Sequence, residues 1–296
     1  MGARGKEFVP LVQPTEKKPR AADSSFSDIT LLKDNFFLST WLCFGAVAQG
    51  VLFLVAGRLA LVPAVALLLY RSLDAYAQAI GWKHNPYMDG ILMKKHSAVF
   101  PDETGNFGSK ASNKDVVVLL IGARCNHPLG IFGPNFKELG DYFDNMIKDL
   151  ETHEEFDFLG STAWVNHSDR ATNNELMSVC YFRTVEGLHA FAHSKYHRGG
   201  WDWWNKEYNN MPHLSIYHET YHAPAGNWES IYVNSHISGI NRTSHKVLDD
   251  EGREVYIHPI VDASKGVLKT SAGRMDRSQG LEHEKYGADP YQSQLR

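Results

Sequence analysis

Hydrophobic residues gather first in one long stretch near the start of the chain. Phe36–Ala56 contains no charged residue over twenty-one positions, which as a helix is long enough to cross the roughly 30 Å hydrocarbon core of a bilayer. Arg58 interrupts the stretch, and Leu59–Tyr70 adds only twelve apolar residues, too few for a second complete crossing. We predict a polar segment over 1–35 and a transmembrane or hairpin membrane segment over 36–70. The alternative is a buried helical pair inside a soluble fold.

Basic residues flank this apolar segment in similar number on both sides. They are Lys17, Lys18, Arg20 and Lys33 before it, and Arg71, Lys83, Lys94 and Lys95 after it. Such symmetry favours a hairpin with both ends in the cytosol, and we expect the protein at a membrane, that of the endoplasmic reticulum, with a cytosolic globular part. A single crossing would instead place that part in the lumen, where Asn166-His167-Ser168 and Asn241-Arg242-Thr243 are glycan acceptor sequences.

After a polar connector over 71–113, the pattern becomes that of a mixed α and β domain. Asp115–Ala123 is apolar and rich in β-branched residues on both faces, which is typical of a central strand. From about Asn135 to His153, apolar residues recur at helical spacing. These residues are Phe136, Leu139, Phe143, Met146, Ile147 and Leu150. The short runs Phe158–Asn166 and Leu176–Arg183 lie on either side of a polar loop, which predicts a strand hairpin.

A second helix and a fourth strand complete the predicted domain over 114–239. The helix is weakened at Gly199 and Gly200, the strand is His213–Tyr221, and a shorter strand is expected at Ser230–Asn234. The order predicts an α+β fold, a ferredoxin-like βαββαβ unit with a four-stranded antiparallel sheet and two helices on one face. A second copy is the economical cover for the other face, which predicts a homodimer in the form of a dimeric α/β-barrel. The polar sequence over 240–296 predicts a disordered tail.

Composition and motifs exclude several classes of protein. A net charge of -4 provides no basic field for nucleic acid. Three distant cysteines, Cys43, Cys125 and Cys180, form no CxxC pair and indicate buried thiols in a reducing compartment. The chain has no GxGxxG after a strand, no GxxxxGK[ST], no GxSxG and no HExxH. Redox chemistry must therefore rely on the substrate itself, on a haem or on a partner protein.

Histidine and aromatic residues are concentrated in the second helix and the strand after it. His189, His193 and His197 recur every four residues, so they stack along one helix face. We predict no metal site, since zinc needs a third ligand that this spacing does not supply. The alternative for these histidines is a solvated or dimer-facing helix surface.

Alternation along His213–Tyr221 separates two sets of side chains. Leu214, Ile216, His218 and Thr220 are predicted to face the helices, and Ser215, Tyr217, Glu219 and Tyr221 the other side. His218 is then either a general base in an apolar pocket or a hydrogen-bonded core histidine. Of the tryptophans at 201, 203 and 204, two at most line one pocket, because neighbours on a helix differ by about 100°.

Taken together, the helix and strand carry a recognisable pattern. FxxxxGLHAFAHSxxHRxxWxWW, followed by HLSIYHETY and WESIYVN, resembles the fungal monooxygenases of the antibiotic-biosynthesis-monooxygenase-like family, which are found in secondary-metabolite clusters of the fumagillin type. The resemblance covers roughly Asn113 to Gly239. It implies a dimeric α/β-barrel and a monooxygenase that acts on a lipophilic polyketide or terpenoid intermediate, often beside a membrane cytochrome P450. Cofactor-free oxygenation of this kind needs a base and a dry pocket.

Position and residue type then indicate the site residues. His218 is the predicted base, with His193 and His197 as rivals. The predicted substrate-binding residues are Trp164, Trp201, Trp204, Tyr217 and Tyr221. We expect no flavin or nicotinamide on this chain. Two alternatives stay open: a haem-dependent dehydratase or isomerase of the same fold, with one histidine as iron ligand, and a non-catalytic membrane helper of a pathway cytochrome P450.

Overall fold

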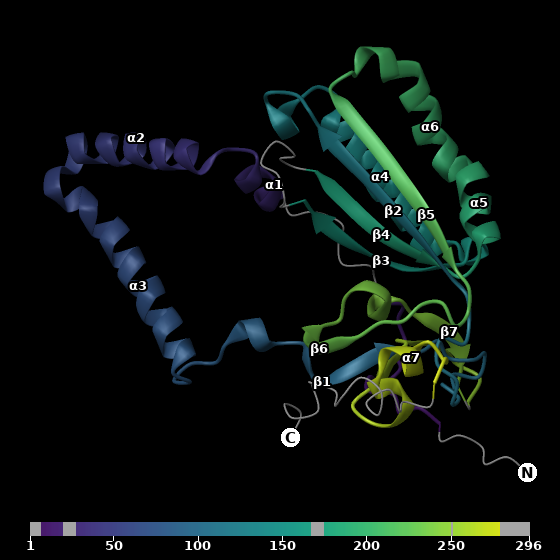
Figure 1. Ribbon diagram of the computed structural model, residues 1–296. Coiled ribbons are helices and arrows are strands. Elements are labelled where there is room, and N and C mark those ends of the chain that lie inside the picture. Colours follow the sequence, from purple (N-terminus) through teal and green to yellow (C-terminus); the bar gives the residue numbers. More distant parts are fainter. Residues whose placement is uncertain (1–6, 20–27, 167–174, 250, 279–296) are drawn as a thin grey trace, which may run out of the picture.

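Four apolar strands form one antiparallel sheet in the order β3-β4-β2-β5. They are β2 Val116–Cys125, β3 Phe158–Val165, β4 Leu176–Phe182 and β5 Leu214–Ala223. The structure is a computed structural model that describes residues 7–19, 28–166, 175–249 and 251–278. Figure 1 shows the sheet together with a second, smaller lobe and a projecting pair of helices.

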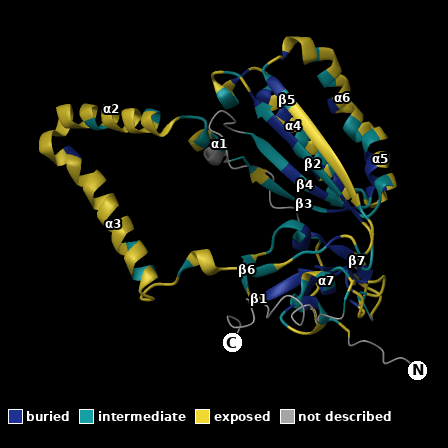
Figure 2. Cartoon of the chain, viewed as in Figure 1, coloured by how far each residue is buried: buried dark blue, intermediate teal, exposed yellow. Residues whose placement is uncertain are grey.

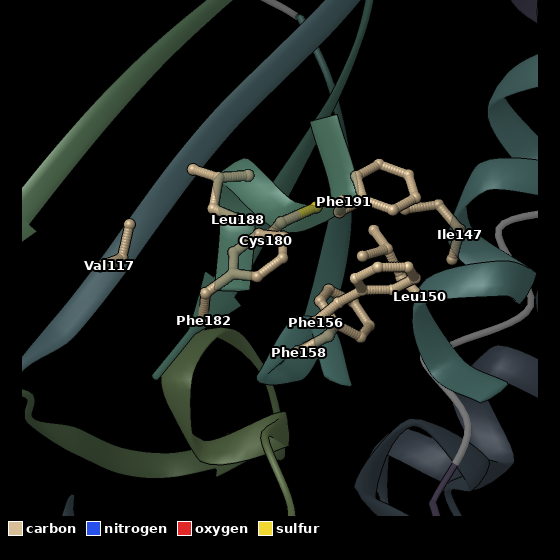
Figure 3. Close-up of a cluster of buried hydrophobic side chains, with 9 residues drawn as sticks. All are labelled: Val117, Ile147, Leu150, Phe156, Phe158, Cys180, Phe182, Leu188 and Phe191. Atoms are coloured by element: carbon tan, nitrogen blue, oxygen red, sulfur yellow. The ribbon is translucent and has the colours of Figure 1, made fainter. Parts of the chain in front are cut away.

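Three helices cover one face of this sheet, because the second of the two predicted helices is divided into α5 and α6. They are α4 Phe136–Thr152, α5 Val185–His193 and α6 Lys195–Glu207. Ile147 and Leu150 of α4 pack with Phe191 of α5 against Cys180 and Phe182 of the sheet, and all five side chains are buried (Figure 3). The predicted βαββαβ order is therefore confirmed, with both halves tied into one apolar core.

The second helical region breaks at Ser194, not at the two glycines where the sequence indicated weakness. The Ser194 hydroxyl donates to the Phe191 carbonyl oxygen and caps the next helix by accepting from the His197 N–H at 3.5 Å. Gly200 is needed for close packing, since a Cβ there would lie 2.4 Å from the Met146 methyl carbon. His193 and His197 thus lie on different helices, and the predicted stripe from His189 to His197 is interrupted.

Segments predicted to be a polar start, a connector and a disordered tail together build the second lobe. Its sheet has the order β6-β1-β9, with β1 Ile91–Ala98, β6 Tyr232–His236 and β9 Ile260–Asp262. Also in this part of the chain are the hairpin of β7 His245–Leu248 with β8 Glu254–Ile257, and α7 Ser271–Arg274. The expectation of a disordered tail is therefore wrong for residues 240–249 and 251–278.

The physical reason is that sparse apolar residues from distant segments share one core. Phe107, Val247, Ile257, Val261 and Leu268 are all buried together. Phe8 from the start of the chain packs against them, and Pro10 forms a β-bridge with Val261. Because each segment alone carries too few apolar side chains to fold, local composition did not reveal the lobe.

The second lobe covers one end of the sheet face that the helices leave open. Val116 and Val118 of β2 and Tyr181 of β4 pack there against Trp228 and Ile240. The sheet face that was predicted to need a second copy is thus partly covered by the chain itself. Trp164, 50% exposed on β3, lies on the part that stays open.

Two apolar helices project from this body. The chain runs from α1 Asp28–Asp34 into α2 Leu38–Ala56, turns at η1 Gly57–Ala60, and returns along α3 Leu61–Ala79 to the second lobe (Figure 1). Almost all of α2 and α3 is exposed (Figure 2). Over Leu38–Ala79 the chain is long and apolar enough to cross a membrane, and only 6% of its most apolar window is buried. A buried helical pair inside a soluble fold is therefore not what the structure shows.

The fold buries the asparagine of one of the two glycan acceptor sequences. Asn241 is 0% exposed, so it has no access to a glycan-transferring enzyme once the lobe has formed. The sequence that begins at Asn166 continues into residues outside the described part of the chain.

Buried histidines make the stability of the second lobe depend on pH. Burial lowers the pKa of His96, His245 and His258. Below about pH 6.5, where histidine in the unfolded chain is protonated, the unfolded state binds more protons than the folded one, so stability is complete above that pH and falls below it. Each histidine contributes up to about 1.4 kcal/mol per pH unit. We expect a lower Tm at about pH 5.5 than at about pH 7.5, measured by calorimetry.

His245 allows this prediction to be tested at one residue. Its ring lies 4.6 Å from that of Phe100, and neither ring nitrogen has a hydrogen-bond partner among the described residues. Leucine in its place leaves no group there to protonate. His245→Leu should therefore reduce the dependence of Tm on pH, and an equally steep dependence in this variant would contradict the assignment.

Candidate active site

A large apolar cavity of about 760 Å³ lies between α4, the helix-covered face of the sheet and α1. The deep lining comes from α4 and strands β2 and β4, and the outer lining from α1, η3 Gly130–Phe132 and the exposed stripe of α4. The lining residues are Leu31, Leu32, Ile121, Ala123, Ile131, Phe132, Phe136, Lys137, Leu139, Gly140, Asp141, Phe143, Asp144, Ile147, Leu176, Met177 and Ser178. A volume of this size suits a small organic molecule.

Periodicity along α4 explains how the cavity is lined. Leu139, Phe143 and Ile147 recur at spacings of four residues, so they present one apolar stripe toward the sheet. Ile121 of β2 projects from the same sheet face as Ser178 of β4, because the two residues are directly paired. The apolar residues that the sequence marked as helix core are therefore also the walls of a cavity.

Gly140 leaves the outer part of the cavity open. It lies in the second turn of α4, and a Cβ built there would meet no other atom within 4 Å. Glycine weakens a helix interior by roughly 0.8–1 kcal/mol relative to alanine. The fold thus keeps an unfavourable helical residue at a position where a side chain would occupy cavity space.

The mouth of the cavity is attached to the start of the projecting helices. The Asn35 side chain donates from Nδ2 to the Leu129 carbonyl oxygen at 3.2 Å, and its Oδ1 accepts from the Ile131 N–H at 2.8 Å. Phe36 packs with Phe132 at a ring separation of 6.4 Å. These contacts hold the base of α2 against the η3 loop that borders the cavity.

In the described part of the chain, four polar side chains reach the cavity. Lys137 and Asp141 pair with each other at 2.6 Å, and their side chains are 86% and 59% exposed, so they belong to the mouth. Asp144, one turn farther along α4, is half-buried, and Ser178 on β4 is buried. A carboxylate accepts protons and a hydroxyl donates a hydrogen bond. The cavity thus offers one base and one oxygen-binding group inside apolar walls.

The three predicted catalytic histidines come together at a different place. His218 projects from edge strand β5 toward the helices, as the alternation predicted, because its partner Ile121 lies on the helix-covered face. Burial lowers the pKa of His197, and the nearby charges of His218 and His193 lower it further. The His197 ring lies 5.6 Å from Phe191 and 5.8 Å from Trp201. None of the three histidines lines the cavity.

A layer of side chains separates this histidine group from the cavity. Phe191, which His197 contacts, belongs to the same buried cluster as Ile147 (Figure 3), and Ile147 is part of the cavity wall. His218 is exposed on the outermost strand. Histidine density in the sequence therefore marked a surface beside the core, whereas the cavity is marked only by the amphipathic α4 and its glycine.

The predicted aromatic residues of the sheet lie on its opposite face. Tyr217 covers Gly122, where a Cβ would lie 2.4 Å from its ring. The Tyr221 hydroxyl donates to the Glu219 carboxylate, and Trp164 shares this face. The structure does not bring these three residues to the cavity under α4.

The predicted tryptophans of α6 fall into two groups. Trp201 is 54% exposed. Trp204 packs with Trp203 against the cluster that contains Ala123 and Leu139, two residues of the cavity lining. Trp204 thus supports a cavity wall from behind and does not reach the cavity itself.

The lining residues do not suit a haem. Haem iron in proteins is held by histidine, cysteine, methionine or tyrosine, and among the described residues Met177 is the single one of these kinds in the cavity lining. Among the described residues, no group of three or more histidine, cysteine, aspartate or glutamate side chains is arranged to hold a metal ion. We therefore derive no step through a haem.

Two comparisons place the chain among known proteins. The family described as "Monooxygenase af470-like" matches residues 116–240, the part that forms the four-stranded sheet and its helices. Monooxygenase af470 of Aspergillus fumigatus is 32% identical over 271 residues, which cover 90% of this chain and 97% of that protein. The similarity therefore extends through the projecting helices and the second lobe.

Solved structures with partial similarity include a cofactor-independent oxygenase, SnoaB from Streptomyces nogalater, with 8% identity, a TM-score of 0.25, and coverage of 36% of this chain and 90% of that one. An aldoxime dehydratase in complex with butyraldoxime matches with 16% identity, a TM-score of 0.31, and coverage of 47% and 33%. At these TM-scores we draw no conclusion from either. On its similarity to the Aspergillus protein, the chain belongs to the monooxygenase af470-like family and is an oxidoreductase of the monooxygenase type.

Proposed function

We propose that this monooxygenase oxygenates a lipophilic polyketide or terpenoid intermediate of fungal secondary metabolism in the cavity under α4. The observation that carries the proposal is the cavity itself, whose walls are mainly apolar and whose volume is about 760 Å³. Burial of an apolar ligand there is favoured by roughly 25 cal/mol for each Å² removed from water. Family membership favours an enzyme over a non-catalytic helper of a cytochrome P450.

The proposed reaction uses no flavin or nicotinamide on this chain. A base removes a proton from an activated CH₂ group of the substrate, and the resulting carbanion gives its electrons to O₂. The hydroperoxide that forms then loses water and leaves a carbonyl group. Overall, R₂CH₂ and O₂ give R₂C=O and H₂O, so the substrate supplies all four electrons. The apolar walls exclude water from the carbanion.

Within the cavity, we propose Asp144 as the base and Ser178 as the group that binds a substrate oxygen. Asp144 is half-buried, farther along α4 than the exposed Lys137 and Asp141 at the mouth. General base catalysis contributes roughly 10²–10⁴-fold to rate. We expect Asp144→Asn to lower kcat at least about 100-fold while leaving Tm close to that of the wild type, as measured by product formation and calorimetry.

The histidine group is the second candidate for the base. Its favourable feature is His197, whose Nδ1 is buried without a hydrogen-bond partner among the described residues. The variants Asp144→Asn, His218→Ala and His197→Ala show which of the two candidates is the base. Full activity of Asp144→Asn together with loss of activity in the histidine variants would move the base to the histidine group.

The first experiment is to identify the substrate. Deletion of the gene should cause the intermediate to accumulate, and the purified protein should convert that intermediate only when O₂ is present. Consumption of one O₂ for each carbonyl formed, without a Soret band or bound flavin, supports the proposal. A Soret band that is required for turnover would instead support the haem-dependent alternative. Unchanged metabolites in the deletion strain would defeat the proposed pathway role.

We further propose that the protein is held at a membrane, that of the endoplasmic reticulum, by α2 and α3, with its body in the cytosol. The exposed apolar surface of both helices supports this.

A related proposal is a homodimer that forms through the open part of the sheet, where Trp164, Tyr217 and Tyr221 are exposed. The molar mass in detergent, measured by light scattering, tests it. A membrane cytochrome P450 remains the proposed protein partner.

A further inference from the structure

Residues from before and after the apolar helices belong to one folded lobe. Leu11 donates its N–H to the Ile260 carbonyl oxygen at 3.0 Å, and Thr15 and Tyr256 exchange two backbone hydrogen bonds at 2.8 and 2.9 Å. A single crossing by α2 or α3 would put these segments on opposite sides of a bilayer whose core is about 30 Å thick. Within this fold, therefore, the two helices enter and leave a membrane from the same side.

The two arms of this hairpin differ in their apolar length. The nineteen residues of α2 carry no charge and extend about 28 Å. In α3, Arg71 and Asp74 follow after only ten apolar positions from Leu61, which extend about 15 Å. The hairpin thus embeds most completely along α2, the arm that is joined through Phe36 and Asn35 to the cavity mouth.

Apolar surface continues from α2 onto the rim of the cavity. Phe37 is 62% exposed, and Leu129 and Phe132 are each 58% exposed. Phe36 packs on Phe132 and also edge-on against Trp41, with ring separations of 6.4 and 5.6 Å. Exposed apolar side chains in such a continuous patch mark a surface that contacts lipid or another apolar partner. Tryptophan at the base of the hairpin suits the membrane interface.

We infer that the cavity opens toward the bilayer, so that the substrate enters sideways from the leaflet next to the body, between α1 and the η3 loop, without crossing water. This rests on the proposed function, because it names the route to that same cavity. The occupant of the exposed rim is thus a lipid surface. A molecule that partitions into the bilayer reaches the cavity at its membrane concentration, which explains why the mouth lies at the hairpin base.

The position of the rim can be measured without any substrate. Leu129 and Leu248 form a matched pair, because both are leucines with 58% exposure, and Leu248 lies on β7 in the second lobe. Cys43 is exposed and is removed by Cys43→Ser, while Cys125 and Cys180 are buried. Nitroxide labels at Leu129→Cys and Leu248→Cys are then compared in the full-length protein reconstituted in phosphatidylcholine vesicles.

We expect the label at 129 to collide mainly with O₂, which concentrates in lipid, and the label at 248 to collide mainly with a water-soluble nickel complex. Equal access of the nickel complex to both labels would overturn the inference. This measurement decides the matter even if the protein converts no tested intermediate, so failure of the proposed function remains distinguishable.

A kinetic comparison tests the route itself. With the accumulated intermediate titrated as a mole fraction of the vesicle lipid, Leu129→Lys should raise the half-saturating fraction at least about tenfold by placing a charge at the rim, with the rate at saturation unchanged. Leu248→Lys should behave as the wild type. Leu129 is not part of the cavity lining. The same half-saturating fraction for Leu129→Lys and the wild type would overturn sideways entry, even with a lipid-facing label.

Discussion

Gly140→Phe should greatly lower turnover without weakening the fold. A side chain at this position of α4 meets no atom within 4 Å, so the phenyl ring enters open space at the cavity and takes the volume that the substrate needs. Removal of glycine from a helix interior favours the helix by several tenths of a kcal/mol. We expect kcat/KM to fall at least about 100-fold, which corresponds to about 2.7 kcal/mol, and Tm to stay the same or rise.

Gly199→Phe is the matched control for this experiment. Gly199 also lies in a helix, α6, and a Cβ there likewise meets nothing within 4 Å. It does not line the cavity, so this variant should keep the activity of the wild type. Equal loss of activity in both variants, or full activity of Gly140→Phe, would show that the cavity under α4 is not where the substrate binds.

Val47→Lys should release the protein from membranes. Val47 is 68% exposed at the centre of α2, where a lysine costs about 3 kcal/mol on insertion into a bilayer. That cost lowers the partition coefficient by roughly 100-fold. No residue of α2 is buried, so the substitution should leave the lobes intact. Flotation of the protein with vesicles on a density gradient measures the effect.

The same flotation experiment includes Leu248→Lys, which makes a similar apolar-to-lysine change at an exposed position of the second lobe. We expect this control to float with the vesicles as the wild type does. If Val47→Lys also floats, α2 does not enter the bilayer, and the exposed apolar surface of the hairpin must serve another purpose.

Local patterns were sufficient to predict the sheet and its helices. The apolar run from Val116 and the helical spacing from Phe136 to Leu150 reflect contacts that each element makes along its whole length, so their period is visible in the sequence. Alternation also placed His218 on the helix-covered side of β5, as the pairing with Ile121 shows.

The second lobe was not predictable in this way. Its core joins Phe107, Val247 and Val261, which lie in three short segments. The four-stranded sheet and its helices lie between Phe107 and the other two in sequence. Each segment reads as polar by itself, because its few apolar residues gain a core only when all segments meet. Long-range pairing of this kind leaves little trace in local composition.

The candidate site was missed for a related reason. Histidines such as His193 and His218 draw attention by their chemistry, but cavity walls consist of ordinary leucine, isoleucine and phenylalanine. The residues that distinguish a cavity from a filled core are those that leave space, here Gly140. A glycine in a helical pattern can also serve close packing or a helix end, so by itself it does not indicate a cavity. Asp144, on the edge of the apolar stripe, reads in the sequence as a solvated charge.

Photochemical crosslinking shows directly whether the substrate binds in the cavity under α4. A diazirine analogue of the accumulated intermediate, added to the wild type in vesicles and activated by light, labels the residues that contact it, which peptide mass spectrometry then locates. We expect labels within residues 131–147 and 176–178, where the cavity lining lies, and their loss in Gly140→Phe. Labels confined to residues 193–218, where the histidine group lies, would contradict it.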